Sequence, residues 1–348
     1  MAKSIVGLEI TEEGVRAAEV MLGRTPRVIA HGSVPLPPGA AKDSEVFDSD
    51  AVVLALRQLW SRAGIKGKNV VLGIGSRRIL VRDYTTQAMR PDLLAQALPF
   101  QVQDLLPVPA EQAVLDFYPV SQEGDQVSGL LVAAVAETVD ELVTAVSKAK
   151  LTVDVVDLAP FALARAVSGV AAAGETLAAL YLGDHTTYVV VVQDGVPRFV
   201  RIIPMEIATE AVRTRAAIGD GVEPTPAMEE VFETVPPSDA PTRRRSAQRG
   251  AARTISMSEE DIREVVSRLG STLRFYADRS AEAPVTRVLL SGAGAAVPGV
   301  AEALTASLPM PVQVVGLSSI LQTKAALASN DVDFSLVSTA GLAMGVVR

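Results

Sequence analysis

Three residues at one predicted turn have the chemistry to bind an anionic group. Gly183 follows an apolar stretch of strand length, and Thr186 and Thr187 open the β-branched stretch that comes next. Such a turn presents main-chain N–H groups and hydroxyls at its mouth, a combination that suits a phosphate. The alternative is an ordinary hairpin turn followed by two threonines that favour a strand. The pattern therefore indicates a candidate phosphate site and leaves a purely structural role open.

The same turn holds two further ionisable groups. Asp184 has the chemistry to hold a metal ion, although an aspartate in a turn more often caps its own backbone. His185 is expected to be a turn residue rather than a catalyst. The sequence contains no Ser-His-Asp set, no cluster of metal ligands and no GxxxxGK[ST] loop. We therefore predict no catalytic residue and no metal ligand.

A carboxylate lies near the end of the first predicted strand, residues 4–10. Glu9 is placed there to order Mg²⁺ or a water molecule, with a solvated strand end as the alternative. Together with Gly7 on the same strand and Thr11 in the turn that follows, it forms the N-terminal part of a candidate nucleotide site.

A glycine turn in the last quarter of the chain completes the candidate site. Gly292, Ala293 and Gly294 follow a predicted strand at 287–290 and precede a predicted helix at 298–308. The two glycines would let the backbone lie against adenine and ribose, or they pack a plain strand-to-helix turn. A short glycine motif alone is weak evidence for a nucleotide.

Two similar sets of three strands position these turns. One set covers residues 4–10, 15–21 and 27–35, and the other covers 177–182, 186–192 and 199–203, with an Asp194-Gly195 hairpin turn in the second set. The segments GRTPRVIA and DGVPRFVR each carry a turn glycine and a Pro-Arg pair, in like positions of the two strand sets. Such a repeat implies two related halves that face one another. Nucleotides often bind in a cleft between halves of this kind.

Between the two sets, residues 76–150 predict a compact α+β module inserted into the first half. Its expected elements are a strand at 79–83, a helix at 92–106 kinked by Pro99, strands at 114–120 and 129–136 around a polar loop at 121–126, and a helix at 139–150 started by a capping box from Thr138 to Glu141.

The predicted organisation has four parts. Residues 1–75 begin the first half, 76–150 form the module, 151–173 carry the connecting helix of the first half, and 174–348 form the second half. Further helices are expected at 50–63, 159–171, 206–218, 259–277 and 336–346. Residues 219–254 are rich in Pro, Gly, Glu, Ser and Arg, and they predict a disordered insertion because they cannot bury enough apolar area to offset their ordering entropy.

Composition excludes several functional classes. The chain has 348 residues, of which 49% are hydrophobic and 21% charged, with a net charge of −8 that argues against nucleic-acid binding. The absence of cysteine excludes thiol catalysis and fits a cytoplasmic protein. No signal peptide is expected, and the longest apolar run, residues 130–136, is too short to cross a bilayer. Any membrane contact is therefore expected through partners.

Five segments in this order resemble the motifs of actin-like ATPases. IVGLEITEEGVRAAEV resembles the first phosphate loop, DVVDLAPFALARAV the first connecting helix, LYLGDHTTYVVVVQDG the second phosphate loop, VTRVLLSGAGAAVPGVAEAL the adenosine motif, and STAGLAMG the second connecting helix. The resemblance implies an α/β fold of duplicated actin-like (ribonuclease H-like) domains. The inserted α+β module, of SHS2-like type, resembles that of the PilM family of type IV pilus assembly. The related FtsA family ends in an amphipathic membrane helix, which the final residues here do not resemble.

Departures from the family pattern bear on catalysis. Thr11 stands where a glycine is expected, Tyr181 stands where the second carboxylate is expected, and Met205-Glu206 replaces a Gly-Gly pair. A missing carboxylate removes a ligand for Mg²⁺ and for the attacking water in phosphoryl transfer. Reduced or absent hydrolysis is therefore expected, while binding of ATP and Mg²⁺ stays an open alternative.

The resemblance implies a cytoplasmic scaffold at the inner face of the plasma membrane, in a type IV pilus or related secretion machine. Its implied partners are the N-terminal peptide of a PilN-like membrane protein, bound in a groove beside the module, and other pilus assembly proteins. Leu105, Leu106 and Val108 either line that groove or pack the module's own core. One alternative is an active actin-like ATPase with an FtsA-like role in cell division. A small-molecule kinase is another, although it needs a carboxylate base that the second loop lacks.

Overall fold

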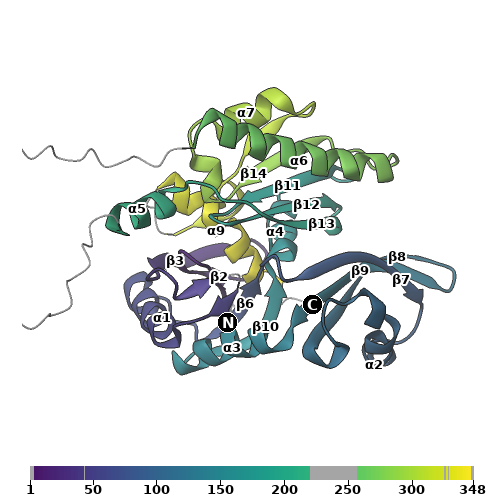
Figure 1. Ribbon diagram of the computed structural model, residues 1–348, viewed down its shortest axis with the longest axis horizontal. Helices are drawn as coiled ribbons and strands as arrows, with labels where there is room; N and C mark the ends of the chain where they lie inside the picture. Colours follow the sequence, from purple (N-terminus) through teal and green to yellow (C-terminus); the bar gives the residue numbers. More distant parts are fainter. Residues whose placement is uncertain (1–3, 43, 220–256, 325–326, 328, 346–348) are drawn as a thin grey trace, which may run out of the picture.

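The computed structural model describes residues 4–42, 44–219, 257–324, 327 and 329–345. The predicted insertion at 219–254 lies, apart from Gly219, outside the described residues. Figure 1 shows three bodies: a first lobe at lower left, a second lobe above it, and a smaller sheet at lower right. The chain passes from the first lobe to the smaller sheet, returns, and then forms the second lobe.

The first lobe is a six-stranded sheet in the order β10-β6-β1-β2-β3-β16. The hairpin strands β1 (Ser4–Ile10), β2 (Gly14–Met21) and β3 (Arg27–Pro35) are antiparallel, and β6 (Asn69–Ile74) and β10 (Thr152–Leu158) continue the sheet in parallel. The two-residue β16 (Gln322–Thr323) comes from the far end of the chain. A separate short hairpin, β4 (Ala41–Lys42) with β5 (Glu45–Val46), precedes the first helix.

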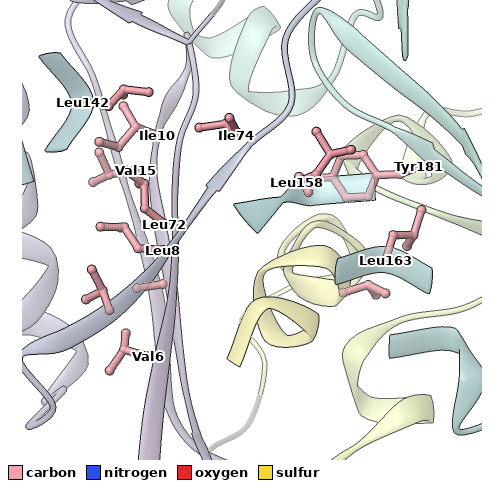
Figure 2. Packing of buried hydrophobic residues seen from close by; sticks show 14 of the residues in the cluster. Val6, Leu8, Ile10, Val15, Leu72, Ile74, Leu142, Leu158, Leu163 and Tyr181 are labelled. Atoms are coloured by element: carbon pink, nitrogen blue, oxygen red, sulfur yellow. The ribbon is translucent and has the colours of Figure 1, made fainter. Parts of the chain in front are cut away.

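Alternation along β1 assigns the two faces of this sheet to different helices. Val6 and Leu8 pack with α1 (Ser49–Ala63) and α3 (Ala136–Lys148), whereas Ile5 packs with α9 (Asn330–Ala343) on the opposite face. Figure 2 shows the first of these groups continuing past Leu158 and Leu163 to Tyr181 of the second lobe. The core therefore runs from one lobe into the other without a break.

The second lobe repeats the hairpin topology in a five-stranded sheet ordered β13-β12-β11-β14-β15. Its strands are β11 (Thr176–Leu182), β12 (Thr186–Gln193), β13 (Val196–Pro204), β14 (Arg287–Ser291) and β15 (Val312–Val314). Asp194 and Gly195 both have positive φ, 50° and 78°, as a two-residue turn between twisted strands requires. Helices α6 (Glu259–Arg279) and α7 (Val300–Ser307) pack on the outer face. The expected repeat of two strand sets is therefore present.

The inserted sheet is antiparallel in the order β7-β9-β8. It comprises β7 (Leu80–Gln87), β9 (Gln126–Val135) and β8 (Ala113–Glu123), covered by α2 (Pro91–Gln101) and two single 3₁₀ turns, η1 (Gln103–Leu105) and η2 (Ala110–Gln112). The strands extend into most of the predicted loop at 121–126, because only Gly124 and Asp125 are needed to reverse the chain.

Two helix predictions in this region are wrong at their ends. Helix α2 stops at Gln101, five residues before the predicted end, because the chain tightens into η1 beyond Pro99. Helix α3 begins at Ala136, directly from β9, and its N-cap residue Val135 has no side-chain cap, so the predicted capping box at Thr138 does not start it. Helix α3 packs against α1 and β10 of the first lobe. Whether residues 76–150 form one unit stays a prediction.

Two helices lie between the lobes. Helix α4 (Ala159–Ser168) is almost wholly buried and packs closely against α9. Helix α9 starts six residues before the prediction because Ser329 caps it, accepting a hydrogen bond from the Val332 N–H. The short helix α8 (Leu317–Ile320) was not predicted. These helices join the two sheets into one body and set the position of the turns between them.

Helix α5 (Glu210–Gly219) begins four residues later than predicted. The segment before it is not helical because its main chain bonds back to the second-lobe turn. The Met205 N–H donates to the His185 carbonyl at 3.0 Å, and the Ile207 N–H donates to the Asp184 carbonyl at 2.9 Å. These bonds hold the turn of β11 and β12 against the base of α5.

Candidate functional site

A buried arginine joins the two lobes where their hairpin turns face one another. Arg16, on β2, donates from Nη1 to Tyr181 Oη at 2.7 Å, and its Nη2 lies 3.1 Å from Asp184 Oδ2. Arg16 is 8% exposed, and Asp184 is 5% exposed. A pair so shielded from water interacts strongly, because the local dielectric constant is low. The contact links residues that are 168 positions apart in the sequence.

The partners of Arg16 are themselves held by hydrogen bonds. Asp184 Oδ1 accepts from Thr209 Oγ1 at 2.6 Å, and Tyr181 Oη donates to the Ser335 carbonyl at 3.2 Å. Burial, followed by the charges of Glu9 and Asp184, raises the pKa of Tyr181, so the phenol is neutral. We call Arg16, Tyr181, Asp184 and Thr209 the Arg16 network.

A second set of ion pairs crosses the cleft nearer its rim. Glu13 Oε1 accepts from Arg215 Nη1 at 2.9 Å and lies 2.7 Å from His185 Nε2. The other ring nitrogen of His185 contacts Glu206. Burial favours the neutral ring, but hydrogen bonds to Glu13 and Glu206 together outweigh it and raise the pKa of His185 to about 9. The histidine is therefore a cation at neutral pH, and it bridges two carboxylates.

Glu9 points away from solvent, toward α9. It is 5% exposed and accepts from Ser338 Oγ at 3.0 Å and from the Thr339 hydroxyl. Burial raises the pKa of Glu9 despite the nearby Arg16 charge and these hydroxyls. The solvated strand end considered from the sequence is therefore wrong. Gly7 faces the same helix, because a Cβ there would lie 1.9 Å from the Thr339 carbonyl oxygen.

The predicted phosphate residues gather around a small cavity. Glu9, Thr11, Gly183 and Thr186 line a space of about 60 Å³ between the two turns. The turn at Gly183 is tight, since a Cβ there would meet the Thr186 carbonyl oxygen at 2.5 Å. Sites for small molecules usually enclose roughly 300–1,000 Å³, so this cavity is much smaller than a usual small-molecule site.

The glycine turn packs against protein. A Cβ at Gly292 would lie 2.3 Å from the Leu182 carbonyl oxygen, and one at Gly294 would lie 2.7 Å from Leu182 Cβ. Of the three residues predicted there, Ala293 lines a larger cavity of about 760 Å³ beside the Arg16 network. Thr187 is fully buried, with Met205 Sδ 3.9 Å from its hydroxyl.

The larger cavity is rich in carboxylates. Glu13, Asp184, Glu210 and Asp331 all line it, and its two arginines, Arg16 and Arg215, are both ion-paired. Burial, followed by the charge of Asp184, raises the pKa of Asp331 to about 6. The part of the chain that the structure describes contains no group of three or more His, Asp and Glu arranged to hold a metal ion.

Sequence reasoning missed the residues that join the lobes. Arg16 and Glu9 are paired in register on neighbouring apolar strands, so a buried ionic role could have been inferred there. The sequence interpretation treats Tyr181 as a lost carboxylate and Asp184 as a local cap. Their contacts with Arg16 depend on how two distant hairpins meet, which no local pattern encodes.

A groove lies between the first lobe and the inserted sheet. It has a volume of about 630 Å³ and is lined by Val46 and Ser49 from the first lobe, by Glu111 and Gln112 from η2, and by one side of α3. Lys148, the groove's cation, donates to Ser49 Oγ at 3.2 Å. Four carboxylates line the groove and have no ion-pair partner among the described residues: Glu111, Glu137, Asp140 and Glu141.

The apolar residues suggested for a peptide groove beside the module lie outside this one. Leu106 packs with Leu98 and Val102 in the core beneath α2, Leu105 is exposed, and Val108 is half-buried. None of Leu105, Leu106 and Val108 lines the groove. Within the described ranges, no helix is both long and apolar enough to span a bilayer.

Two duplicated sheets of this topology, with buried helices between them, define the actin-like ATPase fold. The chain belongs to the type IV pilus assembly protein PilM family, which matches residues 7–346. It is similar to the solved structure of a PilM-PilN type IV pilus biogenesis complex, with a TM-score of 0.77, 21% identity and full coverage of both chains. The expected family and fold are therefore confirmed.

Two other solved structures are more loosely similar. The ethanolamine utilization protein EutJ from Carboxydothermus hydrogenoformans has a TM-score of 0.48 and 14% identity over 99% of this chain and 90% of that one. An activator of 2-hydroxyisocaproyl-CoA dehydratase from Clostridium difficile, solved with bound ADPNP, has a TM-score of 0.41 and 12% identity over 98% and 93%.

Proposed function

We propose that this protein is a scaffold of a type IV pilus or related secretion machine, and that it binds the N-terminal cytoplasmic peptide of a PilN-like inner-membrane protein. Membership of the PilM family and full-length likeness to a PilM-PilN complex support this role. The protein would then be cytoplasmic, held at the inner face of the membrane through its partners, which include other pilus assembly proteins.

The groove beside the inserted sheet is the observation that carries the proposal. Val46, Val135 and Ala136 form an apolar wall, and unpaired carboxylates surround it. An extended peptide would place apolar side chains against this wall and basic side chains beside Glu137, Asp140 and Glu141. Complementary charge of this kind mainly determines which partner is selected and how fast it associates.

We further propose that the nucleotide site is degenerate. A Mg²⁺-bound triphosphate needs open space between the turns and oxygen ligands free to meet the metal. Here the space between the turns is about 60 Å³, and Arg16 and Thr209 engage Asp184, a carboxylate in its wall. The residues present do not fit Mg²⁺-ATP in a hydrolytic arrangement, so no catalytic step is assigned to the chain.

The alternative is an active actin-like ATPase. The larger cavity of about 760 Å³, with Ala293 in its wall, favours it because that volume accommodates a nucleoside. Calorimetric titration with ATP and Mg²⁺, followed by a phosphate-release assay, separates the two. Turnover clearly above that of a buffer blank would refute the degenerate site and leave the peptide-binding proposal intact.

Peptide binding is tested by fluorescence anisotropy with a labelled N-terminal cytoplasmic peptide of a PilN-like protein. We expect the double variant Asp140→Lys/Glu141→Lys to weaken binding at least tenfold. The matched control Glu123→Lys/Asp125→Lys adds the same charge at the exposed tip of the β8–β9 hairpin and should bind normally. Failure of the unmodified protein to bind, or undiminished binding by the groove variant, would refute the proposal.

A further inference from the structure

The Arg16 network occupies the place where a nucleotide would otherwise join the lobes. In a fold of two facing halves, a bound phosphate contacts the hairpin turns of both. Here Arg16 comes from the first lobe, while Tyr181 and Asp184 come from the second. We propose that these side chains hold the lobes together in place of a nucleotide, so that the protein keeps its closed arrangement without any ligand in the cleft.

The bonding within the network supports this role. Arg16 reaches Tyr181, Asp184 and Thr11, the last at 3.4 Å, and both Asp184 oxygens accept a bond. A buried charge is tolerated only when it is paired and fully hydrogen-bonded. Opening the cleft would separate Arg16 from Asp184 and leave both charges without these partners. The closed state is therefore favoured by the chain itself.

The rim contacts add a second set of connections across the same cleft. Arg215 donates from Nη2 to the Glu12 carbonyl at 2.7 Å and to the Leu36 carbonyl at 3.0 Å, besides its ion pair with Glu13. His185 meets Glu13 from the second-lobe turn. Two arginines, one from each lobe, thus reach across the cleft in opposite directions.

Exchanging these contacts for a bound phosphate would be unfavourable in free energy. A phosphate group entering between the turns would have to displace Arg16 from Asp184, and it would then lie beside that buried carboxylate. Like charges in such an environment repel strongly. We therefore expect Mg²⁺-ATP to leave the distance between the lobes unchanged.

Interlobe distance is measurable directly, because the chain has no cysteine of its own. Spin labels on Ser61→Cys in α1 and Ala306→Cys in α7, both exposed, report the separation by double electron–electron resonance. We expect one narrow distance distribution in the nucleotide-free protein and the same distribution with Mg²⁺-ATP at about 10 mM, on the order of ten times the upper end of common KM values.

Variants of the Arg16 network test whether it holds the lobes together. Arg16→Leu should broaden the distribution and move it to longer distance, whereas the control Arg24→Leu, at an exposed turn, should leave it unchanged. Should Arg16→Leu not fold, Asp184→Asn keeps the shape while removing the charge, and it should broaden the distribution less. A narrow, unshifted distribution in the variant that folds would overturn the proposal, as would a broad wild-type distribution that ATP narrows. Peptide binding in the groove is a separate measurement, so neither result decides it.

Discussion

Gly341 of α9 lies directly against Ala162 of α4, and a Cβ at Gly341 would be 2.0 Å from the Ala162 carbonyl oxygen. At this point the backbones of the two helices between the lobes are in direct contact. Arg165, one turn along α4, reinforces the contact by donating from Nε to the Gly341 carbonyl at 3.2 Å. This crossing joins the first lobe to the second independently of the Arg16 network.

Gly341→Ala should therefore destabilise the protein. Overpacking in a closely packed region typically costs about 1–3 kcal/mol, and a clash with backbone leaves little room for relaxation. Urea unfolding followed by circular dichroism measures the loss. Gly23→Ala is the matched control, since nothing lies within 4 Å of a Cβ there. Equal stability of the two variants would contradict the close approach.

Ser258→Ala should weaken the start of α6. Ser258 Oγ accepts from the Asp261 N–H at 3.1 Å, and the Asp261 carboxylate accepts from the Ser258 N–H at 2.9 Å. Loss of a cap of this type costs about 1 kcal/mol. The same urea experiment measures it, with Ser147→Ala on the exposed side of α3 as the control. A change no larger than the control's would count against the cap.

Alkaline pH should weaken the protein through His185. Its folded-state pKa of about 9 exceeds the ordinary value of 6.5, because its hydrogen bonds to Glu13 and Glu206 outweigh burial. The folded state therefore binds the proton more tightly. This contribution is fully present below pH 6.5 and is lost as pH rises through about 9.

His185→Gln removes that titration. Unfolding free energies of the wild type and the variant should differ most near pH 6 and converge above about pH 9. Unfolding in urea across this range provides the comparison. A difference that stays constant with pH would show that His185 does not carry the charge described.

Asp331→Asn should stabilise the protein at neutral pH. Burial, followed by Asp184, raises the folded-state pKa of Asp331 to about 6 from 3.8. Because this pKa is raised, the contribution of Asp331 to the free energy of unfolding is most favourable below pH 3.8. That contribution falls as pH rises through about 6. Asparagine does not ionise, so the Asp331→Asn variant does not lose stability as pH rises in this way.

We therefore expect the stability advantage of the Asp331→Asn variant to be present at about pH 7.5 and to shrink as pH falls toward about 5. Thermal unfolding in matched buffers measures it. The control is Asp50→Asn, in the exposed first turn of α1. Asp333→Asn is less suitable, because Asp333 accepts hydrogen bonds from Ser318. An advantage for Asp331→Asn that is independent of pH would be inconsistent with the raised pKa.

Local sequence determined the strands and turns well. The strands at Ser4–Ile10, Arg27–Pro35 and Thr152–Leu158 follow from runs of apolar and β-branched residues between turn formers. The Asp194-Gly195 turn follows from its own backbone preferences. These features depend on residues within a few positions of one another, and the repeat of the two strand sets is visible for the same reason.

Only the tertiary structure decided what the turns do. Glu9 is buried under α9 because Ser338 and Thr339, over 300 positions away, provide its hydrogen bonds. Gly292 and Gly294 lie so close to Leu182 that a Cβ at either position would clash with it. The pairing of Arg16 with Asp184 exists because two hairpins, each locally ordinary, meet across a cleft. Local patterns specify backbone shape, whereas the distance between side chains from separate lobes depends on how the whole core packs.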